Sequence, residues 1–198
     1  MENWLAISPW PGLVLWAILY ISDYYLTIYS ARGFREIGHF LFEGSFELTP
    51  QFQKDVDKLS PLSKRHVILL FVYSFIIYIL WAVFTKLIYL PWAYNLYLGM
   101  FLLMEVGVHM RHLRNIFLIR EIRKNDGVDG EIMYRRWLSY KVSAFDFSLF
   151  GFLFLVVALL GFSTFFLGGA IMCFGIGVKH NNLSKKAKKD SLQSAENQ

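Results

Sequence analysis

Two short groups of glutamate and histidine have the spacing of metal ligands on a helix. Glu105, His109 and His112 follow one another at positions i, i+4 and i+7, so on a helix they share one face. The second group has the spacing i, i+3 and i+7 and consists of Glu36, His39 and Glu43. A Glu-x-x-His pattern, combined with carboxylates from other helices, holds two irons in four-helix bundles. If both segments are helical, the two faces together predict a site for a divalent transition metal, Zn, Fe or Mn.

Two other interpretations of these residues remain open. The arginines that flank the two groups are Arg32, Arg35, Arg111 and Arg114. They could form salt bridges with the acids at a membrane interface, or the acids could line an ion or proton path. The segment after Gly33 is also undecided between helix and strand, because Phe42, Phe46 and Leu48 alternate with polar residues.

Three acidic residues lie within or beside apolar runs and are candidates for an ion or proton path: Asp23, Glu105 and Asp146. An ionisable side chain within a membrane span is costly unless it is paired or hydrated. Asp23 is the deepest, and the polar band of Ser22, Asp23, Tyr25 and Thr27 should point into the bundle. Hydrogen bonds from tyrosine hydroxyls to this aspartate would let it either carry protons or fix two helices together.

These residues are carried by a chain with the composition of a membrane protein. Of its 198 residues, 56% are hydrophobic and 18% aromatic, and a span of about 20 apolar residues is needed to cross a bilayer. We expect a single membrane domain over residues 1–181, built as an all-α helix bundle. No Gly-rich phosphate loop, Ser-His-Asp order or zinc-protease motif is visible, and the single cysteine, Cys173, lies in an apolar stretch without a basic neighbour.

The apolar runs predict five spans, with four as the alternative. Three cover residues 11–29, 67–90 and 92–108, and the last apolar stretch covers residues 144–178. As one helix that stretch would be about 50 Å long, too long for one ordinary crossing. Gly161 and Ser163 offer a helix stop and a helix start, so we predict two spans there. The alternative is one uninterrupted helix on which Gly161, Gly168 and Gly175 form a close-packing seam.

The distribution of charge orients these spans. Nineteen of the 20 Lys and Arg residues fall after residue 30, after residue 110 and at the C-terminus, and Lys86 is the exception. The positive-inside rule therefore places residues 31–66, residues 111–142 and the C-terminal tail in the cytoplasm and the N-terminus outside, and we expect the cell membrane as the location. The net charge of +5 fits attraction to anionic lipid headgroups, and not nucleic acid.

The polar segments carry three local predictions. Thr49-Pro50 starts a helix on which Phe52, Val56 and Leu59 share a face, as in a short helix on a membrane surface. Residues 131–141 are expected to lead helically into the fourth span. Residues 182–198 have the composition of a disordered basic tail.

Three classes of function remain open on these grounds. The first is a small ion- or proton-linked transporter or channel that uses Asp23 and Glu105. The second is a membrane metalloenzyme that uses the Glu and His faces. The third is a noncatalytic subunit of a membrane assembly, with a homo-oligomer or another membrane protein as its partner and the glycine seam as its contact. The residues do not decide whether the chain is an enzyme.

Overall fold

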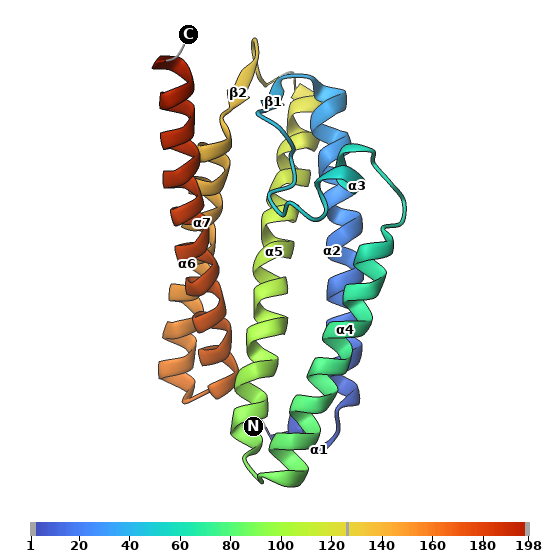
Figure 1. Cartoon of the computed structure of the whole chain (residues 1–198). Coiled ribbons are helices and arrows are strands. Elements are labelled where there is room, and N and C mark those ends of the chain that lie inside the picture. Colours follow the sequence, from blue (N-terminus) through green and yellow to red (C-terminus); the bar gives the residue numbers. More distant parts are fainter. Residues whose placement is uncertain (1–2, 126, 197–198) are drawn as a thin grey trace.

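A computed structural model describes residues 3–125 and 127–196 and is mostly helical (Figure 1). Its helices are α1 (Asn3–Ile7), α2 (Trp10–Ile37), α3 (Gln53–Asp57), α4 (Lys64–Trp81), α5 (Pro91–Asn125), α6 (Arg136–Gly161) and α7 (Thr164–Glu196). A π-helical turn, η1 (Ala82–Leu87), continues α4, and the strands β1 (Phe40–Phe42) and β2 (Ile132–Tyr134) complete the elements. The predicted helical bundle is therefore present.

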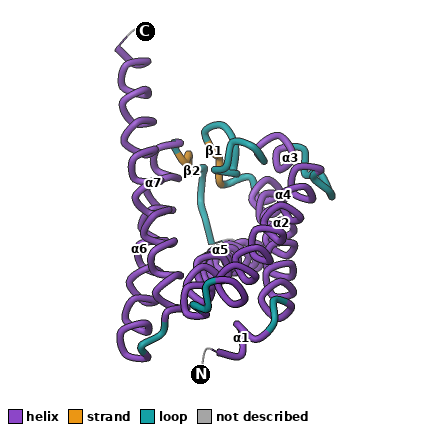
Figure 2. Tube along the Cα trace, turned by 60° about the horizontal axis from the view of Figure 1, so that its bottom comes forward, coloured by secondary structure: helices purple, strands orange, loops and turns teal. Residues whose placement is uncertain are grey.

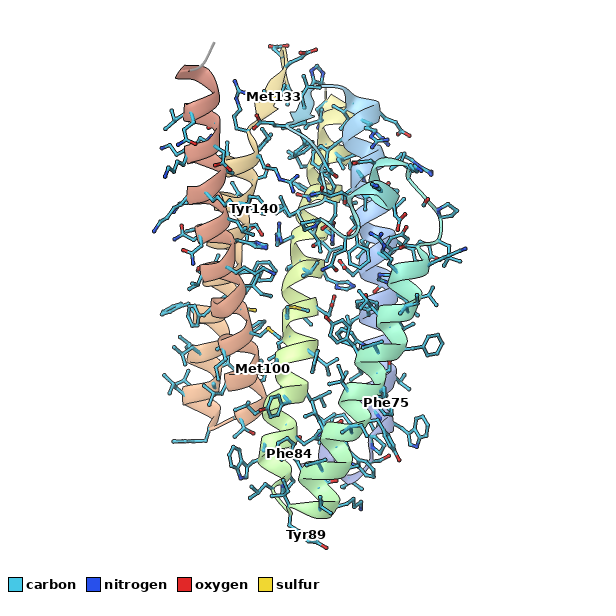
Figure 3. The ribbon with its side chains drawn as sticks, in the orientation of Figure 1. Phe75, Phe84, Tyr89, Met100, Met133 and Tyr140 are labelled. Carbon is cyan, nitrogen blue, oxygen red and sulfur yellow. The ribbon has the colours of Figure 1, made fainter. Side chains whose placement is uncertain are left out.

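Three segments are long and apolar enough to cross a membrane: Trp10–Ile37, Lys64–Leu87 and Arg136–Gly161. The helices α5 and α7 lie alongside them but carry strongly polar ends. Many apolar side chains point outward from the bundle. Phe75 of α4 projects from its outer surface in Figure 3 and is 65% exposed.

The long helices are arranged around α5. In Figure 1, α5 lies between the pair α6 and α7 and the pair α2 and α4, and it contacts both pairs. The turns that join α4 to α5 and α6 to α7 lie at one end of the bundle, which we call the turn end. The strands, α3 and the C-terminus lie at the opposite end, which we call the loop end (Figures 1 and 2).

The last apolar stretch is divided into two helices, as predicted. α6 ends at Gly161, and Phe162 adopts a left-handed conformation with φ of 48°. The Ser163 hydroxyl then accepts a hydrogen bond from the Phe166 amide at 3.2 Å and caps α7. The alternative of one uninterrupted helix is wrong. The left-handed cap of α6 is Phe162, one residue after the glycine that was expected to take this place, and Ser163 starts the next helix.

A glycine contact joins α5 to α7, but it differs from the seam considered above. A Cβ atom at Gly168 would overlap the carbonyl oxygen of Leu96, and one at Gly99 would overlap the carbonyl oxygen of Phe165. Gly161 and Gly175 meet nothing within 4 Å. The seven-residue repeat of glycine is thus not one packing face, and only Gly168 of the three serves a close approach between backbones.

The polar connections are shorter than predicted. α2 continues to Ile37, α5 to Asn125 and α7 to Glu196, so helix replaces much of the expected loops and of the expected disordered tail. The polar end of α7 is held against α6. The Ser184 hydroxyl donates to the carbonyl oxygen of Trp137 at 2.8 Å, and the Lys188 ammonium lies 5.3 Å from the Trp137 ring centre.

The two connections at the loop end pair through a small parallel sheet. Phe40 lies opposite Ile132, and Phe42 opposite Tyr134. Residues 131–141 are therefore not one helix, because the first part forms β2 and α6 begins at Arg136. The strand interpretation of the segment after Gly33 is confirmed over Phe40–Phe42.

The short helix predicted after Pro50 forms as α3. Its Val56 side chain is 1% exposed and packs on Tyr24, Ile28 and Ala31 of α2. Phe52 and Leu59 flank the same contact. The apolar face that predicted a membrane-surface helix is therefore covered by the bundle itself.

Candidate functional site

A cavity of about 680 Å³ lies among α2, α5 and α7 and beneath the connection that contains β1 and α3. We call it the polar cavity. Its inner end is lined by Trp16, Tyr73 and Phe101, and its outer end at the loop end by Arg111 and Lys179. Asp23 and Glu105 lie on its wall. Two of the three predicted path residues therefore face the same space, from two different helices.

Glu105 is the most buried acid of this wall. Glu105 is only 3% exposed, and its Oε2 atom has no hydrogen-bond partner among the described residues. The carboxylate interacts electrostatically with Asp23. The hydroxyl of Tyr20, within electrostatic reach of both acids, is also buried without a partner among the described residues. A buried carboxylate such as that of Glu105, with an oxygen that accepts no hydrogen bond, needs a proton or another cation to offset its loss of hydration.

Asp23 is paired with a histidine, whereas the sequence predicts hydrogen bonds from tyrosine hydroxyls. Its Oδ1 atom lies 3.0 Å from Nε2 of His112, which also lies 3.1 Å from the Thr27 hydroxyl oxygen. A carboxylate can only accept, so Nε2 carries the hydrogen. Tyr25 points away from the bundle and is 53% exposed, because it falls on the opposite face of α2. The predicted inward band therefore consists of Ser22, Asp23 and Thr27.

His109 makes a second contact between the same two helices. Its Nδ1 atom lies 2.7 Å from the carbonyl oxygen of Glu105, so Nδ1 must be the donor. The other ring nitrogen, Nε2, lies 2.7 Å from the Ser22 hydroxyl oxygen. His109 and His112 thus extend the Glu105 face of α5 toward the loop end, as their spacing predicts, and both are held by α2.

Asp146 lies beside the outer end of the cavity, between two arginines of α5. Its carboxylate is 3.3 Å from Nε of Arg111 and 3.1 Å from Nη1 of Arg114. The Arg111 guanidinium also lies 5.2 Å from the Phe147 ring centre. These two arginines therefore form ion pairs, but with Asp146 and not with a glutamate of the two predicted groups, and the pairs join α5 to α6.

Two further titratable groups line the cavity at the loop end. Burial raises the pKa of the Glu47 carboxyl, opposed by the Thr49 amide, which donates to it at 2.6 Å. The second group is His180 of α7, whose Nδ1 atom lies 2.8 Å from the Ser143 hydroxyl oxygen.

The second predicted metal-binding face does not join the first. α2 ends at Ile37 and Gly38 takes φ of 76°, so Glu36, His39 and Glu43 do not share a helix face. Glu36 pairs with Arg123, His39 Nδ1 lies 2.6 Å from the Gly130 carbonyl oxygen, and Glu43 accepts from the Arg136 amide at 2.7 Å. Within residues 3–125 and 127–196, no three His, Cys, Asp or Glu side chains are grouped so that they could hold a metal ion.

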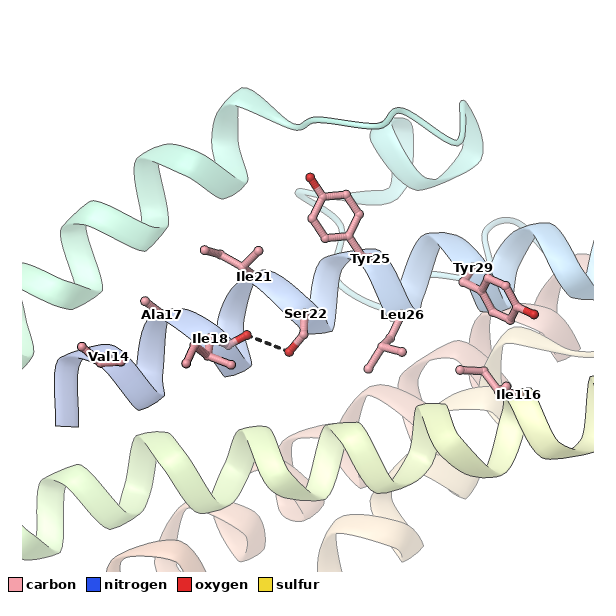
Figure 4. Close-up of a pocket in the computed structure, with 9 residues that line it drawn as sticks. All are labelled: Val14, Ala17, Ile18, Ile21, Ser22, Tyr25, Leu26, Tyr29 and Ile116. Atoms are coloured by element: carbon pink, nitrogen blue, oxygen red, sulfur yellow. Dashed lines mark hydrogen bonds between the residues drawn. The ribbon is translucent and has the colours of Figure 1, made fainter. Parts of the chain in front are cut away.

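An apolar groove of about 810 Å³ runs along the outside of α2 (Figure 4). We call it the outer groove, and its lining includes Ile18, Ser22, Tyr25 and Tyr29 of α2 with Ile116 of α5. The Ser22 hydroxyl donates to the Ile18 carbonyl at 2.7 Å, as drawn in Figure 4. Ser22 therefore borders this groove and also contacts His109.

Sequence reasoning missed Glu47 and the aromatic inner wall of Trp16, Tyr73 and Phe101. Glu47 lies in a connection without periodicity, and the aromatic residues look like ordinary core or interface residues in a chain this rich in aromatic side chains. Their convergence depends on helix packing that one sequence does not reveal.

Comparison with known proteins identifies no relative: no family model matches the chain, and neither a curated protein nor a solved structure matches it.

Proposed function

We propose that this protein is a multi-pass transporter of the cell membrane that moves protons, or another small cation, along a path lined by Asp23 and Glu105. The observation that carries the proposal is the Glu105 side chain, which is 3% exposed, faces the polar cavity and has an unpartnered carboxylate oxygen among the described residues. Acids of this kind inside membrane helices are rare and mark ion pathways and proton relays.

The proposal includes five crossings, with α4 and η1 acting as one span and α2, α5, α6 and α7 as the others. It is supported by the three apolar segments described above and by the outward-facing apolar side chains. It is also supported by the position of the basic connections at the loop end. By the positive-inside rule the loop end is cytoplasmic and the N-terminus is outside.

The three candidate path acids differ in what surrounds them. Asp146 is neutralised by Arg111 and Arg114, so we assign it to holding α5 against α6. Asp23 lies 3.0 Å from Nε2 of His112, and the Thr27 hydroxyl lies 3.1 Å from the same nitrogen, so His112 links the acid to its own helix and to α5. Glu105 has no ion-pair partner within residues 3–125 and 127–196. Asp23, His112 and Glu105 are therefore the residues we place in the path.

The same proposal assigns two surfaces to lipid. The outward apolar side chains would contact the bilayer core. The lysines near the end of α7, Lys185, Lys186, Lys188 and Lys189, would lie beside anionic headgroups. A homo-oligomer or another membrane partner would cover part of the same apolar surface.

Proton flux into liposomes tests the proposal. The purified protein is reconstituted with a pH-sensitive dye inside, and an inward proton gradient is applied with valinomycin and potassium to prevent a charge block. We expect the wild-type protein to dissipate the gradient faster than protein-free vesicles. Glu105→Gln keeps the size of the side chain but cannot carry a proton, so the flux should fall by about tenfold or more.

Glu131→Gln is the matched control, because it makes the same chemical change at an exposed acid outside the cavity. It should leave the flux unchanged. Equal fluxes in wild type and Glu105→Gln, both above those of protein-free vesicles, would rule out the path through Glu105.

A further inference from the structure

We propose that the polar cavity binds a small organic cation, with its positive group beside Glu105 and Asp23 and its apolar part against the aromatic inner wall. This inference names a substrate class for the transport proposed above and rests on that proposal. It combines the unpartnered buried acid with the shape, charge and aromatic lining of the space around it.

The charge at the inner part of the cavity favours a cation. Asp23 and Glu105 line this part, and they interact electrostatically with each other. His112, which is hydrogen-bonded to Asp23, carries a charge only when protonated. Arg111, which also acts electrostatically on Asp23, is paired with Asp146. A ligand with a positive group would therefore meet two acids, and Glu105 has an oxygen without a partner among the described residues.

The inner wall offers aromatic surface to the same ligand. The Trp16 ring lies edge to face with Tyr73 and Phe101, at centroid distances of 5.7 and 5.5 Å. All three line the cavity, and Tyr20 stacks on Trp16 at 4.9 Å. Faces of Trp, Tyr and Phe attract organic cations, most strongly where water is excluded. An acid next to such a wall is suited to a cation that also has an apolar surface.

The spacing of the acids argues for a bulky cation. Among the described residues, no three potential ligands are grouped closely enough to hold a metal ion. The cavity volume of about 680 Å³ is within the range of sites for drug-sized molecules. Acids that are spread over a large wall interact better with a cation of diffuse charge than with a small ion that needs short bonds.

The outer end of the cavity has the opposite charge and helps to orient the ligand. Lys179 lines it, together with Arg111 and Arg114, and the carboxylates of Asp146 and Glu47 offset these three positive charges only in part. This end repels a cationic group, so the positive end of the ligand is placed at the acids and its remaining part toward the aromatic wall.

Binding of a matched pair of ions tests the inference. Isothermal titration calorimetry is carried out on the full-length protein in detergent with tetraphenylphosphonium and with tetraphenylborate, an anion of the same shape. Detergent without protein gives the background from micelle partitioning. We expect the phosphonium to bind at least about tenfold more tightly than the borate, because the acids distinguish the sign of the charge.

Three variants assign the binding to this site. Glu105→Gln should weaken the binding of the phosphonium by about tenfold or more. Glu105→Asp keeps the charge, so its affinity for the phosphonium should fall less. Phe101→Leu removes one ring of the aromatic wall and should weaken phosphonium binding by about two- to tenfold. Glu131→Gln should have no effect, and gel filtration with thermal unfolding shows whether each variant is folded.

Equal binding of the two ions, or equal phosphonium binding by wild type and folded Glu105→Gln, would overturn the inference. That outcome leaves proton flux through Glu105 intact as a separate result. Selective phosphonium binding without any proton flux would instead contradict the proposed proton path. In that case Glu105 and Asp23 would form a cation-binding site without a proton path.

Discussion

Two buried acids of this protein have opposite surroundings and therefore opposite roles. Asp146 lies between Arg111 and Arg114, whereas Glu105 faces the polar cavity with an oxygen that lacks a partner among the described residues. An ion pair between packed helices is sensitive to removal of one partner, because the other charge is left with little water. An acid without an ion-pair partner does not hold two helices together in this way.

This difference gives the first prediction, on stability. Asp146→Asn should lower the free energy of unfolding by about 2 to 3 kcal/mol, since Arg111, whose side chain is 23% exposed, would lose its carboxylate. The measurement is thermal unfolding in detergent. Glu36→Gln removes the acid of an exposed pair with Arg123 and should change the stability by at most about 1 kcal/mol. Similar losses in the two variants would show that the Asp146 pair is no more than a surface contact.

At the scale of single residues, the sequence predicted the important acids but not all their partners. Asp23 and Glu105 stand out because a charged residue in an apolar run needs an explanation, and both line the cavity. The partners depend on helix rotation. Tyr25 lies two positions from Asp23 but on the outside of α2, and His112 takes the place that a tyrosine hydroxyl was expected to have.

The close contact between α5 and α7 is the most constrained feature at the scale of elements. Gly99 approaches the carbonyl oxygen of Phe165, and Gly168 approaches the carbonyl oxygen of Leu96. The two contacts are reciprocal, so the helices pack backbone against backbone. A side chain at either position has to separate them.

Gly168→Ala is therefore expected to destabilise the protein by about 1 to 3 kcal/mol, the usual range for added volume in a packed interior. Thermal unfolding in detergent measures the change. Gly175→Ala is the control on the same helix, because a Cβ atom there meets nothing within 4 Å, and alanine has the higher helix propensity. A folded Gly168→Ala protein as stable as Gly175→Ala would show that the helices are not in contact at this point.

Prediction of the elements succeeded where the signals are local. The break after Gly161 and the start at Ser163 could be read from capping preferences, and both are present, although the left-handed cap is Phe162 and not the glycine. The strand β2 could not be predicted, because it exists only through pairing with β1, far away in the sequence. The length of α5 was underestimated, because its polar last turns resemble a loop although Ile119 and Ile122 are buried.

Topology is the prediction that concerns the whole molecule. In a chain with Cys173 replaced by Ala, Tyr89→Cys should react with a membrane-impermeant maleimide on intact cells, since Tyr89 is exposed at the turn end. Lys189→Cys should react only after permeabilisation, because five crossings place it in the cytoplasm with the other basic residues.

Glu131→Cys is the control for permeabilisation, since the four-span and the five-span arrangements both leave it in the cytoplasm. Labelling of Lys189→Cys on intact cells would contradict the five-span arrangement. It would also separate the C-terminal lysines from the remaining basic connections and weaken the charge asymmetry on which the orientation is based.

The small parallel sheet at the loop end has a mechanical consequence for the cavity beneath it. It ties the connection after α2 to the connection before α6, and each strand follows a glycine with positive φ, Gly38 at 76° and Gly130 at 75°. Phe40, Phe42 and Tyr134 of the two strands line the cavity. Because the two strands are hydrogen-bonded to each other, a movement of one connection at this end carries the other with it unless the strand pairing is broken.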